Sequence, residues 1–128
     1  MLVFDAEPLL AFFTGEAEAP AVRRLLDRVH QGKEEGGVCT VNLAEAFYFL
    51  HRRSEQDAES AVTALGEWGL VFHPADAVWK EAAKLKADHA IPLGDAYAAA
   101  TALSLKAELV CGADSPFDKI AGVRLRRI

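Results

Sequence analysis

The sequence has few cysteines and no long apolar run, and each shortage excludes a class of protein. Cys39 and Cys111 are its only cysteines, too few for the disulfide framework of a small secreted domain. Neither stands at zinc-site spacing from any of the four histidines, so we expect two reduced, small apolar side chains. No apolar stretch approaches the roughly 18–20 residues of a membrane-spanning helix, so we expect no membrane association.

The sequence also lacks an excess of positive charge. Its formal net charge is -5, which argues against tight nucleic-acid binding by electrostatics alone. A nuclease is still possible, because divalent ions held by clustered acids reverse the local sign of the charge. The N-terminus has no basic segment and no cleavage site, and Asp5 interrupts its first apolar run. It does not have the form of a signal peptide, so we expect a cytoplasmic protein.

The arginines occur in three groups along the chain. One interpretation is that they form solvated helix faces and a charged C-terminal segment, and this is the plainer of the two. The other is that they contact the phosphate backbone of a nucleic acid. The groups are Arg23, Arg24 and Arg28; Arg52 and Arg53; and Arg124, Arg126 and Arg127.

Short apolar runs alternate with helical stretches, a pattern that predicts an α/β fold. With 128 residues, of which 52% are apolar, the chain suits one domain with a substantial core, spanning residues 1–128. Strands are predicted at residues 1–4, 38–40, 69–73, 108–111 and 123–127. Helices are predicted from Pro8 onward and over residues 21–31, 40–53, 54–67, 75–89 and 95–106.

Four acidic residues lie beside apolar runs although they are far apart in the sequence: Asp5, Glu45, Asp95 and Asp114. Each is predicted to fall where a strand ends or near the start of a helix. In an open parallel sheet such positions converge on the edge where ligands bind. Carboxylates gathered there can coexist only around cations. The pattern therefore predicts a hard-metal site suited to phosphate chemistry.

Each of these acids, taken alone, also has a plain structural explanation. Asp5 and Asp95 could cap helices, and Asp114 could be an ordinary turn residue. Glu45 could be present because glutamate favours helices. The joint placement of the four is what favours a site.

Four segments of the sequence resemble the motifs of the PIN domain family. Leu2–Ala6 is an apolar strand ending in Asp5, and Thr40–Tyr48 is a helix carrying Glu45. Ile91–Ala102 contains Asp95 and is the most specific of the four. In Leu109–Phe117 a strand is followed by Asp114 and by Phe117 three residues later. Their order and separations are similar to those of the toxins of VapBC toxin–antitoxin pairs, over nearly the whole chain.

The resemblance implies a PIN-like three-layer α/β/α fold. Its mostly parallel sheet would have about five strands in the order 3-2-1-4-5, with helices on both faces. It also implies a Mg²⁺- or Mn²⁺-dependent ribonuclease that cleaves RNA by means of a metal-activated water. Asp5 and Asp95 would be the principal metal ligands, and Glu45 and Asp114 would complete the cluster directly or through water. The implied partners are RNA, a cognate antitoxin protein and a second copy of the chain in a homodimer.

Two positions depart from the family's pattern. Glu7 and Gly112 stand where the family usually has Ser or Thr, so two hydroxyl groups that would support the site are missing. Glu7 could add a fifth carboxylate or point to solvent, and Asp118 is a further candidate acid. These departures keep open the alternative of a catalytically inactive PIN-like module that binds an antitoxin or RNA. A haloacid-dehalogenase-type phosphatase is disfavoured, because it needs Asp where this chain has Glu7.

Overall fold

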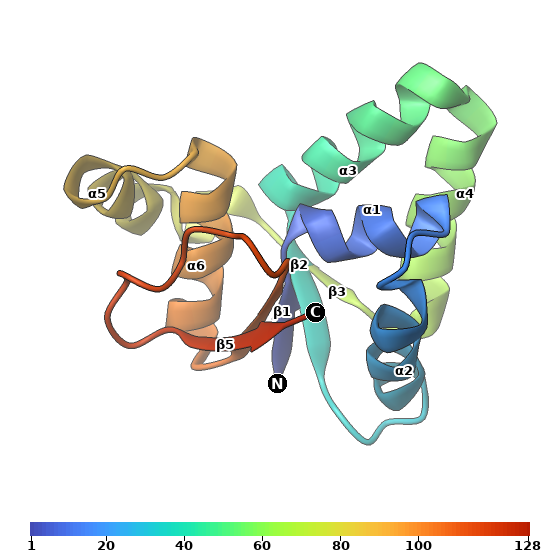
Figure 1. The fold of residues 1–128 in the computed structure, drawn as a ribbon, viewed down its shortest axis with the longest axis horizontal. Coiled ribbons are helices and arrows are strands. Elements are labelled where there is room, and N and C mark those ends of the chain that lie inside the picture. The colour runs from blue at the N-terminus through green and yellow to red at the C-terminus, as the bar shows by residue number, and fades with distance from the viewer.

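A parallel sheet of five strands runs through the middle of the structure, a computed structural model that describes residues 1–128 (Figure 1). Neighbouring strands pair in parallel throughout, in the order β3-β2-β1-β4-β5, so the order 3-2-1-4-5 is confirmed. The strands are β1 (Leu2–Phe4), β2 (Gly36–Cys39), β3 (Val71–His73), β4 (Glu108–Cys111) and β5 (Arg124–Arg127).

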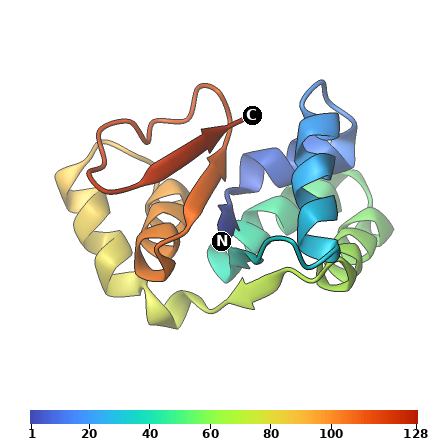
Figure 2. The same ribbon diagram turned by 90° about the horizontal axis from the view of Figure 1, so that it is seen from below.

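Helices cover both faces of the sheet, as Figures 1 and 2 show. One apolar core lies between the sheet and α1, α2 and α4, and a second lies between the sheet and α5 and α6. Helix α3 follows β2 directly and packs against α1, α4 and α6. The helices are α1 (Ala6–Thr14), α2 (Ala19–His30), α3 (Thr40–Arg53), α4 (Glu55–Trp68), the short 3₁₀ turn η1 (Ala75–Ala77), α5 (Trp79–Asp88) and α6 (Leu93–Leu105).

The central strands are apolar at successive positions because both faces of the sheet are buried. Side chains alternate between the faces, so each strand contributes to both cores. In β1, Leu2 and Phe4 pack toward α1 and α2, whereas Val3 packs toward α6; all three are almost fully buried. Cys39 and Cys111 are buried as free thiols on β2 and β4, with β1 between them, so the expectation of reduced cysteines agrees with the structure.

Helix α6 begins two residues earlier than the sequence predicted. The N–H of Ala96 donates to Pro92 O, so the first helical turn already includes Leu93 and Gly94. Asp95 therefore lies inside the first turn and is not the helix cap. Beyond it, the helix is buried in the core among the sheet, α3 and α5, and its small buried residues are Ala96, Ala98, Ala99, Ala100 and Ala102.

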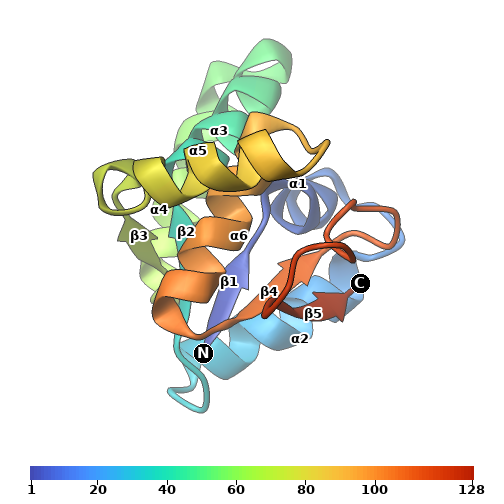
Figure 3. The same ribbon diagram turned by 90° about the vertical axis from the view of Figure 1, so that its left-hand side faces the viewer.

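The single helix predicted over residues 75–89 is divided in the structure. Val78 has φ -133°, outside the helical range, and its buried side chain packs into the core between η1 and α5. Figure 3, seen from the side of α5 and α6, shows both helices in front of the sheet. No helix of the structure is both long and apolar enough to span a membrane.

Candidate functional site

An open cavity of about 470 Å³ lies where β1 and β4 end and where α1 and α6 begin. All four acids singled out in the sequence line it: Asp5, Glu45, Asp95 and Asp114. They come from four segments, namely the residue after β1, the second turn of α3, the first turn of α6 and the loop after β4. The parallel sheet therefore brings together acids that are up to about a hundred residues apart.

Asp5 is the most buried of these acids, with 4% of its surface exposed. It caps α1, because its Oδ1 accepts a hydrogen bond from the N–H of Ala6 at 2.9 Å. Its Oδ2 has no hydrogen-bond partner in the protein. Burial, followed by the charges of Asp95, Glu45 and Glu7, raises the pKa of Asp5 to about 7 against the opposing effect of the Ala6 bond. A carboxylate that served only as a cap would not need this environment.

Asp95 lines the same cavity, and its charge is the largest of those that raise the pKa of Asp5. Burial is the largest influence on Asp95, and the charges of Glu45 and Glu7 add to it, so that its pKa is raised to about 6. Both aspartates thus bind a proton more readily than an exposed carboxylate does. Either a proton or a metal ion would relieve their repulsion.

Glu45 is held in place by Asn42, a fully buried residue one turn earlier on α3. The Nδ2 group of Asn42 donates to Glu45 Oε1 and to Gly94 O, each at 2.9 Å. The Glu45 carboxylate lies directly against Gly94, where any side chain would collide with it. Asn42 thereby ties α3 to the first turn of α6 and keeps Glu45 beside Asp95. The three-residue spacing from Glu45 could have identified Asn42 from the sequence.

Asp114 is exposed on the loop after β4, and Arg127 fixes that loop from β5. The Arg127 guanidinium donates to the carbonyl oxygens of Gly112 at 2.9 Å and of Ala113 and Ser115 at 3.0 Å. Three carbonyls held by one rigid planar group leave the loop little freedom. No local sequence pattern marks this role, because Arg127 lies more than ten residues from the loop.

The two additional candidate acids occupy different places. Glu7 is exposed, and it lines the acidic cavity together with the four acids. Asp118 does not line that cavity. Its carboxylate forms an ion pair with Arg127 at 2.8 Å.

None of the acids lining the cavity is neutralised by a basic group. Every ion pair in the structure involves other acids. The donor set consists of carboxylate oxygens, which are the ligands that Mg²⁺ and Mn²⁺ prefer. No three acids already stand in the arrangement of a metal cage.

A family model described as the PIN domain matches residues 2–123, nearly the full length of the chain. The chain belongs to the PIN domain family. The matched region includes every acid of the cavity. No curated protein sequence matches the chain.

Several solved structures resemble this PIN domain in fold. VapBC2 from Rickettsia felis, solved on a promoter DNA fragment, has a TM-score of 0.77 at 16% identity, covering 99% of this chain and 98% of that one. A toxin–antitoxin complex from Klebsiella pneumoniae has a TM-score of 0.75 at 18% identity, covering 96% of this chain and 95% of that one. VapC20 from Mycobacterium tuberculosis is described as a sarcin-ricin loop cleaving toxin. It has a TM-score of 0.66 at 14% identity, covering 84% of this chain and 85% of that one. At these identities the likeness shows the fold.

Proposed function

We propose that this PIN domain protein is a divalent-metal-dependent ribonuclease and the toxin of a VapBC toxin–antitoxin pair. The observation that carries the proposal is the gathering of Asp5, Glu45, Asp95 and Asp114 in one cavity without a single ion-pair partner. Buried carboxylates with raised pKa values are costly to maintain. Such a cost is typical of a functional site.

The acids would have unequal roles. Asp5 and Asp95 are the proposed principal ligands of Mg²⁺ or Mn²⁺, because they have the most strongly perturbed carboxylates. A divalent ion at such a site supplies an activated water and neutralises negative charge on the phosphate. Glu45, oriented by Asn42, and Asp114, on the loop held by Arg127, would complete the site directly or through water. Without a cation the cavity would repel an RNA phosphate, so we expect RNA to bind productively only after the ion.

We also propose an antitoxin partner, an RNA substrate and a homodimer. Two of the similar structures are described as VapBC or toxin–antitoxin assemblies, and the third is described as a sarcin-ricin loop cleaving toxin. An antitoxin could inhibit the enzyme by placing an arginine among the carboxylates, with bidentate hydrogen bonds to one of them. Tyr48 and Phe49 line the same cavity with about half of their surfaces exposed, and they offer adjacent apolar contact.

The test is RNA cleavage by the purified protein on a mixture of structured RNAs. Reactions would contain Mg²⁺, Mn²⁺ or EDTA, and would compare the wild type with Asp5→Asn and Asp95→Asn. Asp27→Asn is the matched control, because Asp27 lies on α2 and pairs with Arg23 outside the cavity. We expect cleavage by the wild type and the control with either ion, and none with EDTA or with either site variant.

Two results would count against the proposal. Cleavage that persists in EDTA or in both site variants would overturn the metal mechanism. Binding of RNA or of an antitoxin without cleavage of any RNA would favour the alternative of an inactive PIN-like module.

A further inference from the structure

The Glu7 carboxylate lies where it would be too close to any side chain at residue 112. Glu7 lies in the first turn of α1, and its carboxylate rests against Gly112 on the loop after β4. A Cβ atom at residue 112 would come closer to the carboxyl carbon and to both oxygens of Glu7 than real Cβ contacts allow. Gly112 does not have a positive φ, so its backbone would accept alanine. A side chain at this position would therefore require the Glu7 carboxylate to move.

The carboxylate of Glu7 is held on one side and free on the other. The hydroxyl of the buried residue Ser115 donates to Glu7 Oε2 at 3.1 Å. Glu7 Oε1 has no hydrogen-bond partner in the protein, and no basic group pairs with this carboxylate. Because Arg127 fixes the loop at the carbonyls of residues 112, 113 and 115, the surface against which Glu7 rests is itself fixed.

The charge of Glu7 is directed toward the other acids. Glu7 lines the same cavity as Asp5, Asp95 and Asp114. After burial and the nearer carboxylates, its charge contributes to raising the pKa of both Asp5 and Asp95. Asp5 is almost fully buried and keeps its Oδ2 without a partner in this cavity. A cation bound to Asp5 would therefore also be attracted by Glu7.

We propose that Glu7 is a fifth acidic ligand of the cation site. Ser115 holds its carboxylate by a hydrogen bond, and Gly112, which has no side chain, leaves room for it. The proposal rests on the metal site proposed above and extends it to a residue outside the family's four acids. Glu7 would bind the divalent ion directly or through one of its waters, and would raise the affinity of the site for that ion.

The test is a Mn²⁺ titration of the metal-free protein by calorimetry, a measurement that does not depend on catalysis. Glu7→Gln keeps the size of the side chain and an acceptor for Ser115 but removes the charge. We expect Glu7→Gln to weaken Mn²⁺ binding about tenfold or more, the size of effect seen when a supporting group of a metal site is removed. Asp5→Asn should abolish binding, and the control Asp27→Asn should bind as the wild type does.

A second variant pair tests the space at residue 112. Gly112→Ala should displace the Glu7 carboxylate and so lower the Mn²⁺ affinity, with little change in the melting temperature, because the displaced group is the end of a flexible, exposed side chain. In a Glu7→Ala background the same substitution should leave the affinity unchanged, because no carboxylate remains to be displaced. Equal effects of Gly112→Ala in the two backgrounds would contradict the contact.

The outcomes separate this proposal from the metal site itself. Wild-type affinity in Glu7→Gln combined with lost binding in Asp5→Asn would overturn the role of Glu7 and leave the site intact. If Asp5→Asn binds Mn²⁺ as tightly as the wild type does, or the wild type binds none, the proposed site fails and Glu7 fails with it.

Discussion

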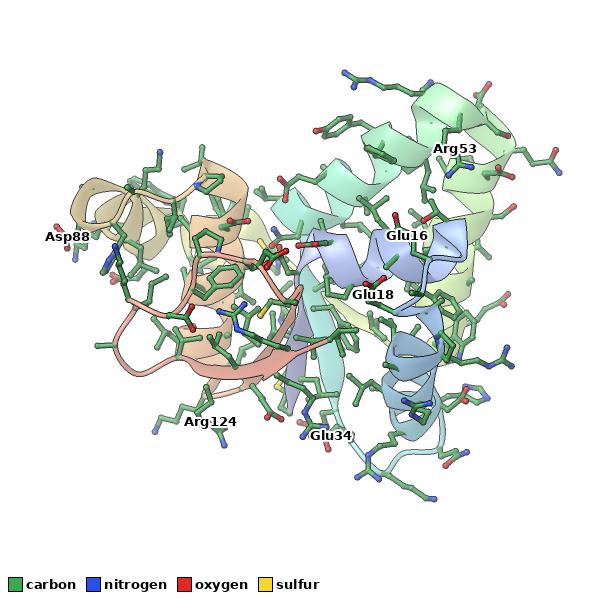
Figure 4. The ribbon with its side chains drawn as sticks, in the orientation of Figure 1. Glu16, Glu18, Glu34, Arg53, Asp88 and Arg124 are labelled. Carbon is green, nitrogen blue, oxygen red and sulfur yellow. The ribbon has the colours of Figure 1, made fainter.

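Acidic residues lie at both edges of the sheet, but they form ion pairs at one edge and have no basic partner at the other. At the amino-terminal edge, Glu34 pairs with the α-amino group of Met1 at 2.9 Å and with Arg28 at 3.7 Å. Nearby, Glu108 pairs with Arg126 at 2.9 Å. Figure 4 labels Glu34 at the foot of the sheet. At the carboxyl-terminal edge, Asp5 and Asp95 line a shared cavity and pair with no basic group.

The two edges shift the pKa values of their carboxylates in opposite directions. The hydrogen bond and charge of the Met1 amino group, with further help from Arg28, hold the pKa of Glu34 below its usual value. Burial and neighbouring acids raise that of Asp5 from 3.8 to about 7. A shift of about three pKa units costs about 4 kcal/mol when the carboxylate is charged. Acids at the first edge therefore support the fold, whereas the charges of those at the second oppose it.

The largest expected effect is on catalysis at the carboxyl-terminal edge. Asp5→Asn should lower the rate of metal-dependent RNA cleavage by about a thousandfold or more, because a metal ligand supplies several kcal/mol of transition-state stabilisation. Single-turnover cleavage at saturating Mg²⁺ measures this rate. A loss of less than tenfold would mean that Asp5 is not a principal ligand.

The same substitution should make the metal-free protein more stable. Asn keeps the acceptor that caps α1 but removes the buried charge, so Asp5→Asn should raise the free energy of unfolding at pH 8 by about 3 kcal/mol. Urea denaturation in EDTA measures it, with Asp27→Asn as the matched exposed-site control. A destabilised variant would place Asp5 among the acids that support the fold, and the contrast between the edges would disappear.

The pH dependence of stability should follow the acids of the cavity. Because the folded pKa values of Asp5 and Asp95 lie above their unfolded values, the stability they contribute is fully present below about pH 4. It is lost as the pH rises through about 6 to 7. Metal-free protein should therefore lose about 2.6 kcal/mol from Asp5 alone between pH 5 and pH 8. Thermal unfolding across this range would show no such fall if the acids did not share a buried site.

The smallest effect is expected at the amino-terminal edge. The pKa of Glu34 is lowered in the folded state, so the stability it contributes is present above the unfolded value of 4.5 and is lost at lower pH. Glu34→Gln should reduce stability at pH 7 by less than about 1 kcal/mol, as for other exposed ion pairs. RNA cleavage should be unchanged. A large loss of cleavage would show that the two edges are not functionally separate.

The sequence predicted much of the fold and the composition of the cavity. Apolar runs that end in Asp5 or lead to Asp114 are local signals, and a parallel sheet brings their ends together by a general rule. What it missed depends on contacts between distant segments. Arg127 reaches back to the loop of Asp114, and Gly112 leaves room for Glu7 from another element. The start of α6 at Leu93 was missed because helix boundaries carry weaker signals than helix interiors.

The most direct test of the account is the effect of Mn²⁺ on unfolding at pH 8. A cation that binds only the folded protein, at about 100 times its dissociation constant, should raise the wild-type free energy of unfolding by about 2.7 kcal/mol. The Asp5→Asn/Asp95→Asn double variant should start out more stable in EDTA and should gain nothing from Mn²⁺. An equal gain in the two proteins, or no gain in the wild type, would contradict the claim that these unpaired acids form a cation site.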